Sequence, residues 1–269
     1  MTESTPLRPI DPIRPPAAYQ GGKRNLSRRL VERIGAIDHH TYVEPFVGMG
    51  GVFFRRDCRP KMEVINDLSG DVACLFRVLQ EHYVPFTEML RFKLSSRSEF
   101  DRLMRQDPTT LTDLRRAARF LYLQTLAFGG KVTDRSIGVS HGQRARFDFT
   151  QIVPRLADIH ERLAGVLIEN LPYDRLIPRY DRPGVLFYID PPYWGCEDDY
   201  GPGMFGPDDF ERLSGLLQGL RGRFMLSLND TPEVRAIFAW AAIEAVGVTY
   251  TLPGKGGVGA KELIIQTPA

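Results

Sequence analysis

The stretch Gly184-Val-Leu-Phe-Tyr-Ile189, which runs directly into Asp190-Pro-Pro-Tyr193, constrains the fold more than any other part of the sequence. It is an uninterrupted apolar run bounded by Arg182-Pro183-Gly184 on one side and by two prolines on the other. A run of this kind predicts a strand buried on both faces of a parallel sheet. The sequence therefore places Asp190 at the carboxyl end of a central strand.

The residues that end this strand carry chemical information. Pro191 favours an extended backbone at Asp190. Both prolines provide a carbonyl oxygen as an acceptor and have no N–H donor. The turn thus presents hydrogen-bond acceptors beside the aromatic ring of Tyr193, an arrangement that suits an amino group on a flat ring. A strand that is simply stopped by prolines is the alternative, and the motif alone does not choose between the two interpretations.

Composition narrows the class of protein. The chain has 269 residues, of which 43% are hydrophobic and 25% charged, values typical of a globular protein with one sizeable core and an inserted or second domain. No apolar stretch approaches the roughly 20 residues of a membrane helix, and the first 16 residues lack the apolar centre of a signal peptide, so we expect a cytoplasmic protein without a membrane partner. Cys58, Cys74 and Cys196 are too widely spaced for a disulfide framework or a Cys-x-x-Cys site, and with five scattered histidines we expect no structural metal.

The distribution of charge points to a partner. The formal net charge is only +2, but residues 91–146 carry 12 Lys and Arg against 5 Asp and Glu, a local charge of +7, which leaves −5 for the rest of the chain. A basic block in an otherwise acidic protein favours a polyanionic partner such as a nucleic acid. A solvated helix surface rich in arginine is the alternative.

Two glycine-rich turns indicate ligand contacts. Tyr19-Gln-Gly21-Gly22-Lys23 precedes a helical pattern, and its exposed N–H groups and lysine could hold a carboxylate; most Gly-Gly pairs, however, are only turns. Thr41 to Glu44 predicts a short strand, and Gly48 and Gly50 allow the backbone to approach a ligand closely, so a nucleotide-type pocket is expected there. The spacing departs from Gly-x-Gly-x-x-Gly, and Glu44 suits a ligand with a positive charge.

A second acid follows the next predicted strand, Met62-Glu-Val-Ile-Asn66. Asp67 lies about 20 residues after the glycines, where a carboxylate can accept hydrogen bonds from both ribose hydroxyls. Capping of the following helix is the alternative role, and the two are compatible.

These residues together carry a resemblance. Tyr19-x-Gly-Gly-Lys23, Glu44-Pro-Phe-Val-Gly-x-Gly50, Asn66-Asp67 and Asp190-Pro-Pro-Tyr193, in this order, resemble the Dam-type family of DNA adenine-N6 methyltransferases over almost the whole chain. The resemblance implies an α/β fold with a Rossmann-like three-layer methyltransferase sheet, S-adenosylmethionine as the cofactor, and an inserted helical target-recognition domain. It also implies methyl transfer to N6 of an adenine flipped out of double-stranded DNA.

The resemblance divides the chain and assigns its residues. We expect a flexible arm or extended strap over residues 1–16, a catalytic domain formed by 17–83 and 165–269, and the inserted DNA-binding domain over 84–164. Catalysis is expected from Asp190, Pro191, Pro192 and Tyr193, with the Asp190 carboxylate and the Pro191 carbonyl as acceptors and Tyr193 stacked on the adenine. Cofactor contacts are expected from Tyr19, Gly21, Gly22, Lys23, Glu44, Pro45, Phe46, Gly48, Gly50, Asp67, Leu68 and Asp190.

The inserted segment is where the sequence departs from the family. Residues 85–94, 98–105 and 112–128 predict helices, and an exposed hairpin or loop follows up to Phe149. Gln124-Thr125 and Phe128-Gly-Gly130 stand where family members commonly have Asn-Arg and Phe-Asn-Gly. The target sequence and the base-reading residues therefore do not carry over, and DNA contacts are expected from Gln124, Lys131, Arg135, Arg144 and Arg146.

The carboxyl-terminal third predicts the rest of the sheet. Residues 207–220 and 232–240 predict helices, 224–228 a buried strand, and 246–252 with 262–266 a closing antiparallel pair. The glycine-rich, aromatic segment 194–206 suits a lid over the target base, or an ordinary surface loop.

Other functions remain open at this level. Cytosine-N4 methylation uses the same chemistry, although the order of the motifs and Tyr193 favour adenine. A catalytically inactive DNA-binding protein and an RNA substrate are further alternatives. A monomer is favoured, and a cognate restriction endonuclease is a possible partner.

Overall fold

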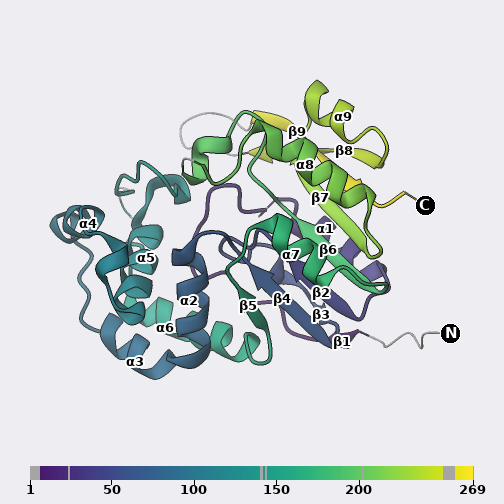
Figure 1. Cartoon of the computed structure of the whole chain (residues 1–269). Helices are drawn as coiled ribbons and strands as arrows, with labels where there is room; N and C mark the ends of the chain where they lie inside the picture. Colours follow the sequence, from purple (N-terminus) through teal and green to yellow (C-terminus); the bar gives the residue numbers. More distant parts are fainter. Residues whose placement is uncertain are drawn as a thin grey trace.

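The computed structural model describes residues 7–23, 25–139, 142, 144–201, 203–250 and 258–268. Its centre is a seven-stranded, mostly parallel sheet with the order β5-β4-β2-β6-β7-β9-β8 (Figure 1). The strands are β2 (Thr41–Glu44), β4 (Met62–Asn66), β5 (Leu167–Glu169), β6 (Val185–Ile189), β7 (Arg223–Asn229), β8 (Ala242–Tyr250) and β9 (Val258–Gln266).

Strand β6 lies in the middle of the sheet, as the apolar run predicts. It pairs in parallel with β2 on one side and with β7 on the other, and all five of its residues are buried. A strand enclosed on both faces and both edges can use apolar side chains at every position, which explains why its sequence does not alternate. The predicted buried strand ending at Asp190 is confirmed.

Helices cover both faces of the sheet and form two hydrophobic clusters. Helices α1 (Ser27–Ala36) and α2 (Gly70–Glu81) pack on one face. Helices α7 (Tyr173–Tyr180), α8 (Pro207–Gln218) and α9 (Pro232–Ile237) contribute to the cluster on the other. The three-layer, Rossmann-like α/β architecture is therefore confirmed.

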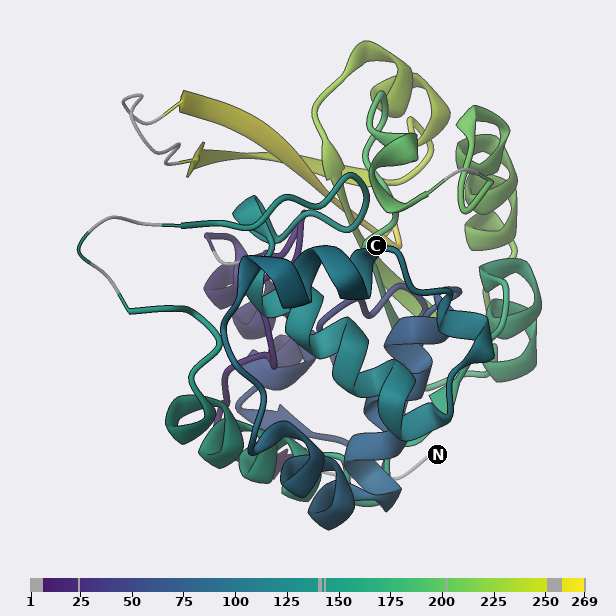
Figure 2. The same cartoon turned by 90° about the vertical axis from the view of Figure 1, so that its left-hand side faces the viewer.

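The closing antiparallel pair is present and longer than predicted. Strand β9 lies between β7 and β8 and runs antiparallel to both. Figure 2 shows that β8 and β9 project on the same side of the molecule as the loop that follows the short helix η3 (Phe128–Gly130). Two projecting segments therefore flank one side of the protein.

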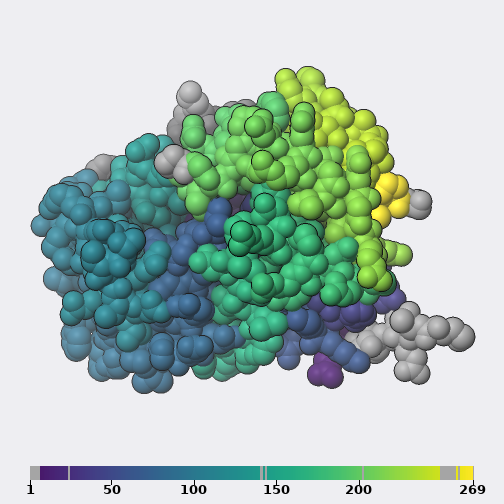
Figure 3. All heavy atoms as spheres, viewed as in Figure 1, coloured from purple at the N-terminus to yellow at the C-terminus, as the bar shows by residue number. Residues whose placement is uncertain are grey.

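The segment between β4 and β5 is helical. Helices α3 (Tyr83–Leu90), α4 (Arg97–Met104) and α5 (Asp113–Leu126) lie close to the predicted ranges, and α6 (Phe149–Arg162) follows the loop. Their buried residues belong to the same cluster as those of α1 and α2, and the surface runs continuously from the helical segment to the sheet domain (Figure 3). The predicted domain limits at residues 84 and 164 stay a proposal.

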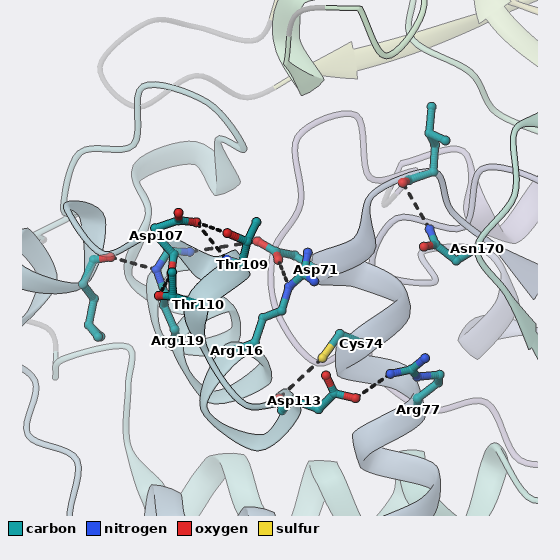
Figure 4. A network of polar contacts seen from close by, with 12 residues as sticks. Asp71, Cys74, Arg77, Asp107, Thr109, Thr110, Asp113, Arg116, Arg119 and Asn170 are labelled. Carbon is teal, nitrogen blue, oxygen red and sulfur yellow. Dashed lines mark hydrogen bonds and ion pairs between the residues drawn. The ribbon is translucent and has the colours of Figure 1, made fainter.

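Two sets of ion pairs connect this helical segment to the sheet domain. Asp71, in the first turn of α2, accepts a hydrogen bond from Arg116 of α5 at 2.5 Å, and Nη1 of Arg119, also on α5, lies 3.9 Å from Asp71 Oδ2 (Figure 4). In the interior, Glu63 of β4 binds Arg162 of α6 and Arg56. Because a buried charge is costly without its partner, these contacts oppose separation of the two parts.

The amino-terminal segment lies against the domain from residue 7 onward. β1 (Arg8–Pro9) pairs with β3 (Cys58–Arg59), and the Ile13 N–H donates to the Phe54 carbonyl at 2.8 Å. This part is an extended strap over the surface, while residues 1–6 of the predicted arm lie outside the described residues. Within the described part of the chain, no helix is long and apolar enough to cross a membrane.

Candidate active site

A cavity of about 1070 Å³ opens where the carboxyl ends of β2, β4 and β6 meet. The chain leaves β2 toward β4 on one side while β6 lies on the other, and such a switch point is where open α/β sheets bind ligands. Pockets for small molecules commonly measure roughly 300–1,000 Å³. This cavity therefore has room for a cofactor and part of a second ligand.

Most of the predicted cofactor residues meet in this cavity. Its wall includes Tyr19, Gly21, Gly22, Lys23, Glu44, Phe46, Gly48, Asp67, Leu68, Asp190 and Pro192. Pro45, Gly50, Pro191 and Tyr193 stand behind or beside that wall and are not among its lining residues.

The two glycine-rich turns fit against each other. The ring of Tyr19 lies on Gly48, where a Cβ atom would come within 2.8 Å of the ring, and Gly48 has a φ of +51°. Only glycine permits both this backbone conformation and this approach. The aromatic wall of the pocket therefore depends on Gly48, which explains the glycine at this place in the motif.

Asp67 is held by backbone groups. Its Oδ2 accepts a hydrogen bond from the Gly48 N–H at 2.8 Å and its Oδ1 from the Ser69 N–H at 2.9 Å. Burial raises the pKa of Asp67 to about 6, although these two hydrogen bonds act in the opposite direction. The carboxylate thus fixes the turn and lines the pocket at once, so the two predicted roles are compatible.

Asn66 holds the turn after β2 in place through hydrogen bonds. This buried side chain donates to the carbonyls of Pro45 and Leu171 at 2.8 and 2.9 Å and accepts from the Leu171 N–H at 2.8 Å. It therefore locks the turn after β2 to the segment after β5. The sequence identified Asn66 as part of a motif but did not predict this role.

Glu44 is a deeply buried acid of the pocket. Its Oε2 accepts a hydrogen bond from the Tyr42 hydroxyl at 2.7 Å, and burial raises its pKa to about 8. A cationic ligand beside it would lower that pKa by favouring the charged form. The position is thus consistent with the predicted contact to a positively charged group, with release of a proton on binding.

Asp190 is held by side chains. Its Oδ1 lies 2.6 Å from Lys23 Nζ and accepts from the Ser227 hydroxyl at 3.0 Å. Within the described part of the chain, Oδ2 has no hydrogen-bond partner. Burial raises the pKa of Asp190 to about 6, and Lys23 opposes the rise.

Tyr193 belongs to the same polar group. Lys23 Nζ donates to its hydroxyl at 2.6 Å, and that hydroxyl donates to Glu262 Oε2 at 2.7 Å. Asn229 holds the next residue, accepting from the Trp194 N–H at 3.0 Å and donating to its carbonyl at 2.9 Å. Ser227, Asn229 and Glu262 come from β7 and β9, which the sequence motifs did not include.

The segment after Trp194 closes over the pocket. The Tyr200 hydroxyl donates to the Gln20 carbonyl at 2.9 Å, and the Thr133 hydroxyl reaches the Asp199 carbonyl at 3.3 Å. Phe205 packs edge-on against Phe46 at a centroid distance of 5.9 Å. This part of the predicted lid thus lies over the cofactor motifs and touches the helical segment.

The residues predicted to contact DNA fall into two groups. Lys131, Arg144 and Arg146 are exposed, and Arg146 also donates to the Ala127 carbonyl at 3.2 Å. Arg135 instead is half-buried and donates to the Gln124 side chain at 3.2 Å. Gln124 itself is fully buried, so its predicted contact with DNA does not fit this position. The regular spacing of Ala117, Leu121 and Gln124 could have identified it as part of the buried face of α5.

Comparisons with known proteins bear on the identity of the chain. Residues 19–252 match the family described as D12 class N6 adenine-specific DNA methyltransferase. The chain belongs to this family. The match includes both glycine-rich turns, Asp67, the helical segment and Asp190 to Tyr193, so the family resemblance inferred from the motifs is confirmed.

Curated relatives of this methyltransferase agree with the family. The chain is 22% identical over 230 residues to the Type II methyltransferase M.CviBI of Paramecium bursaria Chlorella virus NC1A, covering 84% of this chain and 86% of the relative. It is 26% identical over 241 residues to the DNA adenine methylase of Escherichia coli (strain K12) and 25% identical over 234 residues to that of Salmonella typhi. Each of these two alignments covers 81% of this chain and 82% of the relative.

Membership in a methyltransferase family implies a methyl donor of the S-adenosylmethionine type and DNA as the substrate. The pocket suits such a donor chemically, because it combines carboxylates, a lysine, backbone turns and aromatic rings. Among the described residues, no group of three or more His, Cys, Asp and Glu side chains could hold a metal ion.

Proposed function

We propose that this methyltransferase transfers the methyl group of S-adenosylmethionine to N6 of an adenine flipped out of double-stranded DNA, with Asp190 as the residue that accepts the amino group. The observation that carries the proposal is the position of the Asp190 carboxylate in the pocket wall, with Oδ1 bound by Lys23 and Ser227 and Oδ2 available as an acceptor.

The donor end of the pocket lies around Asp67. In the proposed complex the Asp67 carboxylate accepts hydrogen bonds from ribose hydroxyls, Phe46 and Leu68 flank the donor's adenine, and the turn at Gly21 and Gly22 faces its carboxylate. When bound, S-adenosylmethionine supplies an electrophilic methyl group on a positively charged sulfur. The buried Glu44 is the acid suited to that positive charge.

At the reaction end, the chemistry requires an amino nitrogen whose lone pair is delocalised into the purine ring. Hydrogen bonds from N6 to the Asp190 carboxylate and the Pro191 carbonyl localise that lone pair on the nitrogen. They also strengthen as positive charge develops on the nitrogen during methyl transfer, after which the donor leaves as S-adenosylhomocysteine and the nitrogen releases one proton. Ser227 and Lys23 orient the carboxylate, while Glu262 and Lys23 hold the Tyr193 ring that we propose stacks on the adenine.

Charge and shape indicate which side of the protein faces DNA. The exposed Lys131 and Arg144 lie on the loop that projects on the same side as β8 and β9 (Figure 2). Basic side chains at such positions bind phosphates and position a duplex without reading its sequence. We therefore propose that the duplex lies against this side.

Mass spectrometry of nucleosides tests the proposal. Purified protein is incubated with S-adenosylmethionine and double-stranded DNA, and the hydrolysed DNA is analysed. N6-methyladenine is the expected product. N4-methylcytosine would replace the adenine assignment by the cytosine one, methylation of duplex RNA alone would replace DNA by RNA, and binding of DNA without donor binding in calorimetry would indicate an inactive DNA-binding protein.

A further inference from the structure

The buried Gln124 joins three parts of the molecule. Its Nε2 donates to the carbonyls of Ala18 at 2.8 Å and Gly130 at 2.7 Å, and its Oε1 accepts from Arg135 at 3.2 Å. Both N–H groups and the oxygen of the amide are thus in use. One side chain of α5 therefore ties the segment before Tyr19 to the loop after η3.

The first two of these contacts lie at the cofactor pocket, which Ala18 helps to line. Ala18 precedes Tyr19, and the Gly130 carbonyl that Gln124 binds also accepts from the Gln20 N–H at 2.9 Å. Gly130 has a φ of +70°, and a Cβ atom there would be 2.9 Å from the Tyr19 nitrogen. The backbone on both sides of Tyr19 is consequently fixed by Gly130 and Gln124.

The third contact leads toward the basic loop. The guanidinium of Arg135 stands over the ring of Phe120 at 5.5 Å and donates to the Lys131 carbonyl at 3.2 Å. Arg135 thereby folds the beginning of the loop onto α5, next to the exposed Lys131 that the proposed function places on DNA. The loop after η3 and the segment around Tyr19 are therefore both held by the Gln124 side chain.

A second contact, between Asp71 and Arg116, also joins α5 to the cofactor-binding part of the chain. Asp71 lies four residues after Asp67 and binds Arg116 on the same helix as Gln124 (Figure 4). Helix α5 thus contacts both cofactor segments, through Arg116 at the Asp67 end and through Gln124 at the Tyr19 end.

We propose that Gln124 is a positioning residue that couples the DNA-contacting loop to the methyl-donor pocket without touching DNA. When Lys131 binds the duplex, the neighbouring Gly130 is held, and Gln124 transmits that restraint to the segment around Tyr19 that faces the donor. The inference rests on the proposed function. By thermodynamic reciprocity, DNA then tightens donor binding by the same factor by which the donor tightens DNA binding.

The coupling factor is measurable as a ratio of dissociation constants. S-adenosylhomocysteine, which has no methyl group to transfer, is titrated into the protein by calorimetry with and without a saturating DNA duplex of mixed sequence. For the wild type we expect tighter binding with DNA, by a factor within the range of about 5 to 150 that is typical of such coupling.

Two substitutions remove hydrogen bonds of Gln124, one at Gln124 itself and one at its partner Arg135. Gln124→Glu keeps the size of the side chain but removes both N–H donors, so the ratio should fall to about one and affinity without DNA should weaken. Arg135→Ala removes the contact on the Gln124 oxygen from a half-buried loop position and should lower the ratio while leaving the fold intact.

Thr125→Val is the matched control, because among the described residues the Thr125 hydroxyl bonds only to the Leu121 carbonyl of its own helix, at 2.7 Å. Its ratio should equal that of the wild type, and thermal melting shows whether each variant is folded. A wild-type ratio of one overturns the inference, and so does a folded Arg135→Ala variant with the wild-type ratio. Failure of the proposed function appears separately, as wild-type protein that makes no N6-methyladenine.

Discussion

The two ends of the pocket use the same residue type in different ways. Asp67 and Asp190 each follow a parallel strand, and burial raises the pKa of both to about 6. The oxygens of Asp67 bind backbone N–H groups, whereas the bound oxygen of Asp190 contacts the side chains of Lys23 and Ser227. A carboxylate held by the backbone is fixed in place, while one held by side chains can exchange partners when a ligand arrives.

The difference assigns a separate task to each end. A fixed acceptor suits the recognition of a cofactor that binds in one orientation. A carboxylate with one oxygen held and the other available suits a reaction in which hydrogen bonds must strengthen at the transition state. Substitutions at the two ends should therefore affect different kinetic constants.

The largest effect is expected from Asp190→Ala. Loss of the acceptor removes stabilisation that exists mainly in the transition state, so kcat for methyl transfer should fall by roughly 10²–10³-fold or more. Transfer of tritium from labelled S-adenosylmethionine to DNA measures this. Asp230→Ala, which removes an acid paired with Arg235 near the surface, is the control. An Asp190→Ala variant with near-wild-type transfer would contradict the assignment.

A smaller effect of another kind is expected from Asp67→Asn. The substitution keeps the shape but loses a charged acceptor, and hydrogen bonds to charged groups are worth about 1.5–3 kcal/mol, so the Kd for S-adenosylmethionine should rise by about 10- to 100-fold. Calorimetry gives the Kd, and assays at saturating donor give kcat. A variant whose loss appears in kcat alone would remove the contrast between the two ends.

The pH profile sharpens the role of Asp190. Because burial raises its pKa to about 6, kcat/KM for DNA should fall, by up to about tenfold per pH unit, as the carboxylate protonates below that pH. Ser227→Ala removes a hydrogen bond that lowers this pKa, so the decline should begin at higher pH. A wild-type profile that is flat down to about pH 5 would contradict the acceptor role.

The same pKa shifts have a definite sign for stability. The folded protein binds more protons at Asp67 and Asp190 than the unfolded chain between about pH 4 and pH 6. The contribution of these two acids to the free energy of unfolding therefore decreases as the pH rises through this window. Both acids are destabilising at neutral pH, which is consistent with a role in function.

The smallest effect is expected from Tyr200→Phe. It removes only the hydroxyl that donates to the Gln20 carbonyl across the pocket, a contact worth about 1 kcal/mol. Dissociation of S-adenosylmethionine should become roughly fivefold faster while kcat changes little. Stopped-flow displacement measures the rate, and an unchanged rate would show that the hydroxyl does not keep the segment closed.

The sequence predicted the site where its signals were local. The run into Asp190, the turns at Gly21 and Gly48 and the acid at Asp67 each combine a recognisable element with a motif within a few residues. Ser227, Asn229 and Glu262 were not predicted, because they reach the site only through the pairing of β6, β7 and β9, far apart in the chain.

In the helical segment, the sequence predicted the helices but not the positions of their polar side chains. Its helices follow from apolar periodicity, but the direction of each polar side chain does not. Gln124 and Arg135 carry the residue types of a DNA surface, yet they turn inward because two backbone carbonyls and an aromatic ring are available there.

The hydrophobic cluster that α1 and α2 share with helices α3 to α6 limits how DNA specificity can be changed. Exchange of helices α3 to α6 for those of a relative would replace part of a jointly packed interior, so such chimeras should aggregate or unfold. Of its described residues, the loop after Gly130 contributes only Ile137 and Phe147 to that packing. New recognition sequences are therefore best engineered, and in evolution most readily acquired, within the loop alone.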